Sequence, residues 1–439
     1  MDTLIIGAGP AGLMAACFCQ GQTLVIDRMK APGRKLLATG GGRCNLTHAT
    51  DAAGILAAFG RHSRFMSPAL HAFPPPALRA FFRSLGVETL EEPDGCVFPV
   101  SQSAAGVLAA LERSARAHGA EIRCGVRALR LVLEKRDPSS APVGEPSPEQ
   151  RVVGVETDCG LLSARRVILA AGGQSYPDLG SDGSGFALAR KAGLSVVTPV
   201  PALAGIVLRE AWLAPLAGIV AERGGARLDA PGDAKRLLAG PLLFTHKGIS
   251  GPPALALSGE IAARLVAGQE PAPFAGRRSP TSDFRSPAAV PLRLSFVADR
   301  TAQEWRAHFE GWRKTHGGRA LHNLLSGELP RALATALCAE TGLAAAAAAR
   351  AKKSALEALA AACADLRVHA VGTEGWNRAM LTRGGIALGE LDPRTLACNR
   401  IAGLHCAGET VDVDGPCGGY NLTWAFASGR LAGLSAISR

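Results

Sequence analysis

The feature that most constrains the fold is a glycine-rich turn close to the N-terminus. The stretch TLIIGAGPAGLMAA spaces Gly7, Gly9 and Gly12 as G-x-G-x-x-G, directly after a short apolar run. Such glycines allow a tight turn from a strand into a helix and let backbone N–H groups approach a diphosphate. A second apolar run, TLVID, ends in Asp27, whose carboxylate we expect to bind ribose hydroxyls. This order predicts a Rossmann-like α/β domain that binds a dinucleotide, rather than a purely structural glycine turn.

The charge of the chain is positive and unevenly distributed. The 439 residues carry a formal net charge of +11. Between Arg28 and Arg64, seven lysines and arginines face a single acid, Asp51. The excess predicts affinity for anions such as a phosphorylated cofactor, an acidic metabolite or nucleic acid, and the alternative is a solvated basic surface.

The cysteine pattern indicates a reducing compartment. The 11 cysteines are scattered and include no C-x-x-C pair, so neither a disulfide framework nor a metal site is expected. We therefore predict a cytoplasmic protein. The apolar N-terminus carries the glycine motif and lacks a basic region, so we do not expect a signal peptide. No membrane-spanning segment or membrane partner is expected, and the oligomeric state stays open.

Two further glycine-rich motifs follow apolar runs. The first, at 170–185, reads AAGGQSYPDLGSDGSG, and the second, at 403–433, begins GLHCAGETVDVDGPCGGYN. The second motif places a pair of glycines before the last expected helix. The only two tyrosines, Tyr176 and Tyr420, fall inside these motifs. Each is either a site residue or a hydrogen-bonded hydroxyl of the core.

The pattern of predicted secondary structure changes after Pro199. Short β-like runs separated by glycine and proline continue to about residue 300. A helical pattern then covers 301–365 and includes the alanine run 344–349. The stretches 137–150 and 268–289 are rich in proline and serine and are expected to be exposed loops or inserts. The nucleotide-binding domain is therefore predicted to be interrupted by an inserted module.

With these motifs in place, the sequence resembles the BaiN-like (YhiN-like) flavoproteins, which have a glutathione-reductase-type FAD fold. The shared stretches are GAGPAGLMAA, GRKLLATGGGRCNLTH, GGQSYPDLGSDGSG, LLFTHKGISGPPALALS and AGETVDVDGPCGGYNLTWAFASG, in the same order along the whole chain. The resemblance implies an α/β FAD-binding domain at 1–198 and 369–439. It also implies an inserted β-barrel at 199–300 and a small helical subdomain at 301–368.

The resemblance implies a set of cofactor-binding residues as well. The implied set is Gly7, Gly9, Pro10, Ala11, Gly12, Asp27, Arg28, Lys35, Gly41, Gly42, Arg43, Cys44, Ala171, Gly172, Gly408, Glu409, Gly419, Tyr420, Asn421 and Leu422. Lys35, Arg43 and Cys44 would lie close to the flavin, and Glu409 would accept a hydrogen bond from a ribityl hydroxyl. Because no second strand-linked G-x-G-x-x-G follows, NAD(P)H is expected to dock only transiently as electron donor.

Three functions stay open at this point. The first is hydride transfer from reduced FAD to an activated C=C bond, in a small enone or in uridine of ribosomal RNA, because relatives in the family are connected with both. The second is an oxidase of a small amine or amino ketone, which another relative suggests. The third is a non-catalytic, flavin-stabilised RNA-binding protein.

The candidate catalytic residues are Cys44, Tyr420 and His246. Cys44 follows Arg43 in a cationic loop, which favours a lowered thiol pKa and a role as proton donor. The alternative is that Cys44 packs as a small hydrophobe. His246, in the stretch FTHKGISGP, either faces the substrate or is a surface or structural group.

Overall fold

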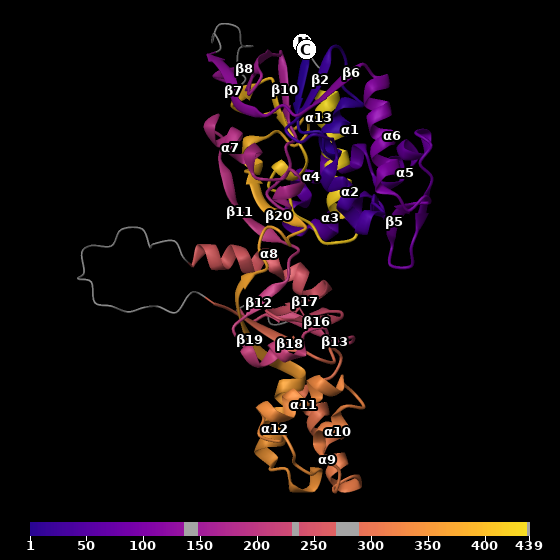
Figure 1. Ribbon diagram of the computed structural model, residues 1–439, viewed down its shortest axis with the longest axis vertical. Coiled ribbons are helices and arrows are strands. Elements are labelled where there is room, and N and C mark those ends of the chain that lie inside the picture. Colours follow the sequence, from indigo (N-terminus) through magenta and orange to yellow (C-terminus); the bar gives the residue numbers. More distant parts are fainter. Residues whose placement is uncertain (136–147, 231–236, 269–288, 437–439) are drawn as a thin grey trace, which may run out of the picture. The chain divides into compact units, whose positions relative to one another are not determined.

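The chain forms two compact units. The computed structural model describes residues 1–135, 148–230, 237–268 and 289–436 (Figure 1). Unit 1 comprises Met1–Val200 and Met380–Arg439, and unit 2 comprises Pro201–Ala379. The expected inserts at 137–150 and 268–289 lie almost entirely outside the described residues. Among the described residues no helix is both long and apolar enough to cross a membrane.

A five-stranded parallel sheet forms the centre of unit 1. Its order is β22-β10-β1-β2-β6, with bounds β22 (Leu404–Cys406), β10 (Arg166–Leu169), β1 (Thr3–Ile6), β2 (Thr23–Asp27) and β6 (Ala120–Cys124). Leu4 pairs with Leu24 on one side and with Val167 on the other. All residues of β1 are buried, as expected for a strand covered on both faces. Since the strands are parallel, their carboxyl ends share one edge of the sheet, where ligands bind in folds of this kind.

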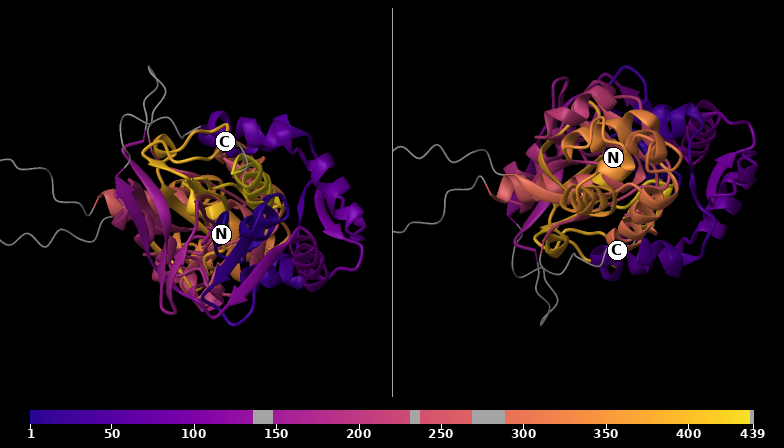
Figure 2. Two further views of the ribbon diagram at one scale, coloured as in Figure 1. Left: turned by 90° about the horizontal axis from the view of Figure 1, so that it is seen from above. Right: turned by 90° about the horizontal axis from the view of Figure 1, so that it is seen from below.

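The first and last helices of unit 1 pack against each other. The helices of unit 1 are α1 (Pro10–Ala16), α2 (Arg34–Ala38), α3 (Ala52–Phe59), α4 (Ser63–Ala72), α5 (Pro75–Ser84), α6 (Ala104–Ala117), α7 (Ser184–Lys191) and α13 (Tyr420–Ser435). In Figures 1 and 2 the indigo N-terminal segment lies beside the yellow α13. A Cβ atom on Gly429 would lie 2.3 Å from the Ala11 carbonyl oxygen, and one on Gly433 would lie 2.5 Å from that of Ala15. The two glycines therefore allow the helix backbones to touch.

Smaller sheets complete unit 1. They contain β3 (Thr47–His48), β4 (Thr89–Glu91), β5 (Cys96–Pro99), β7 (Ala128–Lys135), β8 (Gln150–Thr157), β9 (Gly160–Ser163), β11 (Val196–Ala202), β20 (Leu381–Ile386) and β21 (Ile401–Ala402). Two short 3₁₀ helices at the edge of the parallel sheet are η1 (Thr39–Gly42) and η8 (Gly408–Thr410). β20 pairs with β11, and η8 follows β22, so late segments of the chain meet early ones at this edge.

Unit 2 contains an eight-stranded antiparallel sheet and a helical part. The strands, in sheet order, are β13 (Val220–Ala221), β16 (Leu242–Thr245), β17 (Gly248–Ser250), β12 (Ile206–Leu208), β19 (Leu366–Thr373), β18 (Val290–Ser295), β14 (Gly225–Leu228) and β15 (Leu238–Ala239). The helices are α8 (Pro252–Ala267), α9 (Ala302–Thr315), α10 (Leu321–Leu325), α11 (Arg331–Glu340) and α12 (Lys353–Asp365). Trp305 and Phe309 on α9 are fully buried in the core of this unit. The predicted barrel corresponds to this sheet, and its closure stays a prediction.

One detail of unit 2 differs from the expectation, and a second bears on the expected domain bounds. The alanine run 344–349 is not part of an α-helix, because it turns and then pairs with an earlier segment: Ala347 bridges to Ala320, and Leu321 donates to the Ala346 carbonyl oxygen at 3.0 Å. Tertiary pairing thus overrides the high helix propensity of alanine. Residues 369–373 belong to β19, which pairs with β12 and β18 of unit 2. The functional division of the chain at 198, 300 and 368 stays a prediction.

The edge strand β22 carries a buried histidine. Burial, with a smaller contribution from the charge of Arg166, lowers the pKa of His405 to about 4. In the unfolded chain the imidazole of His405 takes up a proton near pH 6.5, whereas in the folded chain it does so only near pH 4. The contribution of neutral His405 to the free energy of unfolding is therefore present above pH 6.5 and is lost as the pH falls toward 4. We expect the free energy of unfolding to be about 2 kcal/mol lower at pH 5 than at pH 7 from this group alone. Denaturant titrations of the wild type and His405→Gln check this, because the variant should lack that part of the decline.

Candidate functional site

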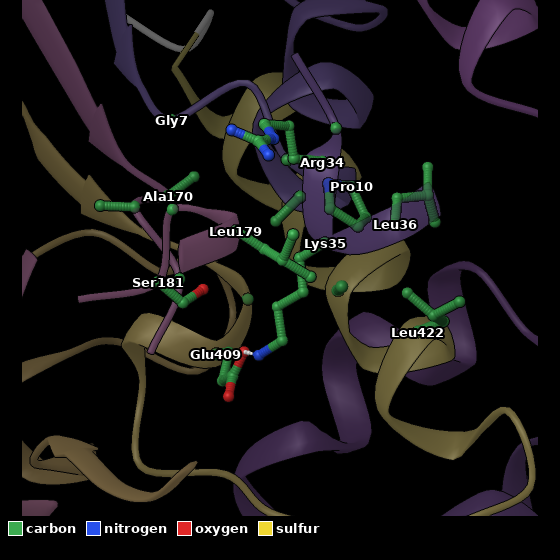
Figure 3. A pocket seen from close by; sticks show the side chains of 18 of the residues that line it. Gly7, Pro10, Arg34, Lys35, Leu36, Ala170, Leu179, Ser181, Glu409 and Leu422 are labelled. Carbon is green, nitrogen blue, oxygen red and sulfur yellow. Dashed lines mark hydrogen bonds and ion pairs between the residues drawn. The ribbon is translucent and has the colours of Figure 1, made fainter. Parts of the chain in front are cut away.

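A crevice opens at the carboxyl edge of the parallel sheet in unit 1. It encloses about 1010 Å³ of space between atoms, a volume that includes the solvent at its open mouth. The predicted cofactor residues that line it are Gly7, Gly9, Pro10, Ala11, Asp27, Lys35, Ala171, Gly172, Gly408, Glu409, Asn421 and Leu422. Figure 3 shows side chains of this wall. The crevice is therefore built from the ends of three parallel strands and the first turns of α1 and α13.

The three glycines of the first motif have different roles. A Cβ on Gly7, whose φ is +105°, would lie 2.4 Å from the Ala170 carbonyl oxygen. A Cβ on Gly12 would lie 1.9 Å from the Gly7 carbonyl oxygen, so Gly12 lets α1 pack against the turn. A Cβ on Gly9 would have no heavy atom within 4 Å. Gly9 alone of the three thus leaves open space, and that space belongs to the crevice.

The start of α1 fits the diphosphate of a dinucleotide. The helix begins after Gly9 with no side-chain cap and no acidic residue in its first turn. The first N–H groups of a helix have no partner inside the helix, so here they are left for an anion. Pro10 at the first position lacks an N–H and costs no hydrogen bond there. The backbone geometry therefore fits the predicted group.

Asp27 is held at the end of β2 by two backbone N–H groups. Ala8 donates to Oδ2 and Met29 donates to Oδ1, both at 2.8 Å. Burial raises the pKa of Asp27 above its ordinary value, and the two N–H groups offset part of this. Each carboxylate oxygen keeps a lone pair for a further donor. The predicted contact with ribose hydroxyls is compatible with this geometry and stays a prediction.

A polar network joins four segments of the crevice wall. Lys35 Nζ lies 2.6 Å from Glu409 Oε2 (Figure 3). It also lies 2.5 Å from the hydroxyl of Ser175. Glu409 Oε1 accepts hydrogen bonds from the Ser175 hydroxyl at 3.1 Å and from the Thr382 N–H at 2.8 Å. The Thr382 hydroxyl in turn accepts from the Gln174 N–H at 2.7 Å. The carboxylate predicted to meet a ribityl hydroxyl is thus already bound to α2, β20 and the loop after β10.

A second hollow adjoins the crevice at Gly7 and Asp27. Backbone and side-chain atoms of Val126, Arg127 and Ala128 line it. Arg28, one of the predicted cofactor residues, lines this hollow rather than the crevice and pairs with Asp182 at 3.0 Å. The segment after β6 contains no motif and could not be found from the sequence.

The loop ATGGGRCN turns away from the crevice after Thr39. Gly41 and Gly42 do not line the crevice, and neither does Arg43. Arg43 Nη1 lies 2.7 Å from Glu92 Oε1, and its guanidinium covers the Phe98 ring at 3.9 Å from the centroid. The cations of this region that line the crevice are therefore Arg34 and Lys35, and not Arg43.

Ion pairs also neutralise most of the basic excess between Arg28 and Arg64. Four of its cations, Arg28, Lys35, Arg43 and Arg61, pair with Asp182, Glu409, Glu92 and Asp414. The other three cations form no ion pair within the described residues and are exposed: Lys30, Arg34 and Arg64. The excess counted along the sequence is therefore not a continuous basic surface, since the compensating acids come from distant segments.

The expected low thiol pKa of Cys44 is wrong. Cys44 has no exposed surface, and burial raises its pKa to about 12. Its backbone has a φ of +66°, and its N–H donates to the Thr39 carbonyl oxygen at 3.0 Å. Desolvation thus outweighs the neighbouring positive charge, which belongs to a side chain directed at Glu92. Cys44 does not line the crevice, and packing is the better interpretation of it.

A chemical test follows for Cys44. The thiolate is the form that reacts with a disulfide reagent. At pH 8 the reagent should therefore modify Cys44 at least a hundredfold more slowly in the native protein than in the urea-unfolded chain. Peptide mapping by mass spectrometry measures this rate, with the exposed Cys159 as internal control. Equal rates at the two cysteines in the native protein would contradict the buried assignment.

The other two catalytic candidates also lie outside the lining of the crevice. Tyr420 begins α13, is half-buried, and stacks on His48 with ring centroids 4.7 Å apart. Burial raises the pKa of its hydroxyl. Gly419, just before it, has a φ of +88° and caps the helix without lining the crevice. His246 is exposed in the turn between β16 and β17 of unit 2, and its predicted role stays a prediction.

Sequence reasoning missed the apolar wall of the crevice. The missed lining residues include Met29, Leu36, Leu179, Met380, Leu381, Val413 and Trp424. Trp424 is only 2% exposed, yet it borders the crevice. An apolar side chain gives the same pattern whether it faces a core or a cofactor. Within the described residues no group of three or more histidines, cysteines and carboxylates lies together as a metal site would require.

The comparisons with known proteins agree with this architecture. The model of the family described as "HI0933-like protein Rossmann domain" matches residues 1–435. The chain is 32% identical to 3-dehydro-bile acid delta(4,6)-reductase of Clostridium scindens, with 99% of this chain and 98% of that protein covered. It is 27% identical to ribosomal RNA dihydrouridine synthase of Escherichia coli, covering 97% and 96%, and 25% identical to that of Haemophilus influenzae, covering 100% and 98%. With its parallel sheet, its glycine turn and a family match over nearly its whole length, the chain belongs to the HI0933-like family of Rossmann-domain proteins.

Proposed function

We propose that this chain is a reductase that adds hydrogen across a C=C bond conjugated with a carbonyl group in a small cyclic molecule. The observation that carries the proposal is that the relatives matched over nearly their full length have names that describe such additions. One is a reductase of double bonds in a 3-dehydro bile acid, and the others form dihydrouridine. The identity is higher, at 32%, for the relative that acts on a small molecule.

In general terms, the proposed reductase is an FAD-dependent oxidoreductase with a Rossmann-type fold. The crevice residues fit FAD: the open Gly9 and the uncapped α1 suit the diphosphate, and Asp27 suits the ribose. The apolar wall around Leu36 and Trp424 suits a flat ring system. When bound, FAD supplies the hydride for the electron-poor carbon.

The protein's own residues would then bind, orient and screen the reactants. Lys35 has three N–H donors, of which Ser175 and Glu409 take two. The third is left for an acceptor in the crevice, where a positive charge favours a group that gains negative charge. Since Glu409 holds the ammonium in place, the geometry exists before any ligand arrives. The identity of the proton donor to the second carbon stays open, because neither Cys44 nor Tyr420 lines the crevice.

Uridine in ribosomal RNA is the second candidate substrate. Two curated relatives with the dihydrouridine synthase name match almost the whole chain. The exposed cations Lys30, Arg34 and Arg64 would favour a phosphate backbone. The pairing of the other four cations in this region reduces the charge available for that contact. We therefore place RNA second, and a cytoplasmic location fits either substrate.

One experiment tests the proposed function without an external electron donor. Purified protein is loaded with FAD, photoreduced in the absence of oxygen, and mixed with a 3-keto-Δ4 steroid. We expect the flavin absorbance near 450 nm to return together with one equivalent of saturated ketone. A reduced protein that is reoxidised by oxygen but never by the enone would contradict the proposal.

Three further experiments distinguish the alternatives. Peroxide formed from a small amino ketone in air, with no need for a nicotinamide donor, would support the oxidase. Loss of dihydrouridine from ribosomal RNA of cells that lack this protein would support uridine as substrate. FAD that binds but is bleached by no donor would support the non-catalytic alternative.

A further inference from the structure

A third hollow in unit 1, separate from the crevice and from the hollow beside Gly7 and Asp27, is not used by the proposed cofactor. It encloses about 940 Å³ out to its mouth, close to the size of the crevice by the same measure. It lies between the β3–β5–β4 sheet and α5 and is lined by His48, Ala49, Thr50, Pro75, Pro76, Arg79, Ala80, Arg83 and Glu91. None of these residues lines the crevice. The hollow is therefore distinct from the proposed FAD site.

Two arginines line the hollow. Arg79 and Arg83 are four residues apart on α5, so their side chains leave the same face of the helix. The charged groups that line the hollow are these two guanidinium groups and the carboxylate of Glu91. Glu91 lies 3.7 Å from Arg79 Nη1, which is too far for a hydrogen bond. Arg83 is also paired, with Glu88 at 3.3 Å, so the formal charges of the two arginines are balanced by two glutamates.

Both guanidinium groups are held by their Nε edge. Arg79 Nε–H donates to the Thr89 hydroxyl at 3.1 Å, and Arg83 Nε lies 3.3 Å from Glu88 Oε2. Each arginine therefore keeps terminal N–H donors for a ligand in the hollow. Two guanidinium groups on one helix face suit the oxygens of a phosphate, which arginine binds through paired hydrogen bonds.

The hollow lies one aromatic pair away from the crevice. His48, at the end of the GGGRCNLTH motif, lines the hollow and stacks on Tyr420 at 4.7 Å with an angle of 21° between the rings. The next two residues of α13, Asn421 and Leu422, line the crevice. A molecule held in the hollow by its phosphate end could thus place its other end beside the crevice. Pro75, Pro76 and Ala80 give it an apolar wall.

From these observations we infer that the hollow binds the electron donor, a reduced nicotinamide dinucleotide, through a phosphate group held by Arg79 and Arg83. This inference rests on the proposed function, which requires a donor for which the sequence shows no second dinucleotide motif. The phosphate is either the diphosphate common to NADH and NADPH or the 2′-phosphate of NADPH. The phosphate end of the donor would then lie on the hollow side of the His48–Tyr420 pair, and its nicotinamide end would extend past this pair to contact the flavin, as hydride transfer requires.

The test is direct binding of NADPH and NADH to the FAD-loaded protein after photoreduction in the absence of oxygen, so that no oxidised flavin is left to accept the hydride. The fluorescence of the reduced nicotinamide measures the binding. We expect the double variant Arg79→Gln/Arg83→Gln to bind NADPH at least tenfold more weakly while it retains FAD, because two charge-assisted contacts are lost. Equal weakening for NADH assigns the arginines to the diphosphate, and weakening for NADPH alone assigns them to the 2′-phosphate. Arg113→Gln on α6 removes the same charge from an exposed position that lines neither cavity, and it should bind the donor as the wild type does.

Further variants guard against a structural explanation. Arg79→Lys keeps the charge but loses the planar fork, so its affinity for NADPH should lie between wild type and the double variant. Unchanged donor binding in the double variant would overturn the inference. So would a double variant that loses binding to a ribosomal RNA fragment but not to NADPH. Enone reduction by the photoreduced protein needs no nicotinamide donor. Its failure would refute the proposed function, whereas the NADPH affinity of the arginine variants tests the inference about the hollow.

Discussion

Replacing Gly12 by alanine should unfold the turn that carries the cofactor site. The new Cβ would lie 1.9 Å from the Gly7 carbonyl oxygen, a backbone atom that cannot move without displacing β1 or α1. We expect the free energy of unfolding to fall by about 3 kcal/mol, despite the better helix propensity of alanine, and FAD to be lost on purification. Denaturant unfolding followed by circular dichroism, with FAD titration, measures both effects.

Gly9→Ala is the matched control for this change. Gly9 has a φ of −84°, which alanine adopts without strain, and its Cβ would have no neighbour within 4 Å. The variant should therefore unfold within about 0.5 kcal/mol of the wild type. Its methyl group enters the crevice, so FAD affinity should fall while stability holds. Equal destabilisation by both substitutions would refute the division of roles between Gly9 and Gly12.

Replacing Lys35 by methionine should weaken FAD binding by more than tenfold. The change leaves the carboxylate of Glu409, which is only 16% exposed, without its cation. Ser175 and the Thr382 N–H then remain its donors, and the wall of the crevice is free to shift. Loss of a hydrogen bond to a charged group of this kind costs about 2 kcal/mol. FAD titration of the apoprotein measures the change, and Lys30→Met, an exposed neutralisation nearby, is the control.

The coupling between Lys35 and Glu409 is tested by the double variant Lys35→Met/Glu409→Gln. A neutral amide no longer leaves an unpaired charge on the wall, so the double variant should bind FAD better than the sum of the single losses predicts. We expect a coupling energy of about 1 to 2 kcal/mol from the double-mutant cycle. Additive effects would show that the two side chains act independently, contrary to the 2.6 Å contact between them.

The sequence was informative wherever a local pattern determines the structure. The run Thr3–Ile6, the glycine turn and the run ending in Asp27 correspond to β1, the start of α1 and β2. Each depends on residues close together in the chain, whose spacing alone sets a strand or a turn. The pair of glycines before Tyr420 likewise opens α13, because Gly419 takes the left-handed conformation.

Properties that depend on distant partners could not be predicted in this way. Lys35 and Glu409 are 374 positions apart, so no local pattern indicates that they form an ion pair. Cys44 follows a cation in the sequence, but its pKa is decided by burial, which only the folded chain defines. The alanine run 344–349 follows its pairing with the segment around Ala320 rather than its own propensity.

The close contact of α1 with α13 affects the order in which this protein can mature. Unit 1 begins at Met1, yet β22 and α13, which complete its sheet and crevice, are synthesised only after the 179 residues of Pro201–Ala379. At about 5 to 20 residues per second, the N-terminal part waits roughly 10 to 40 s for this segment on the ribosome. During that time the face of α1 that later receives Gly429 and Gly433 lacks its partner. The cofactor site is therefore completed only after unit 2 has been synthesised, and removal of β22 and α13 should abolish it while leaving unit 2 whole.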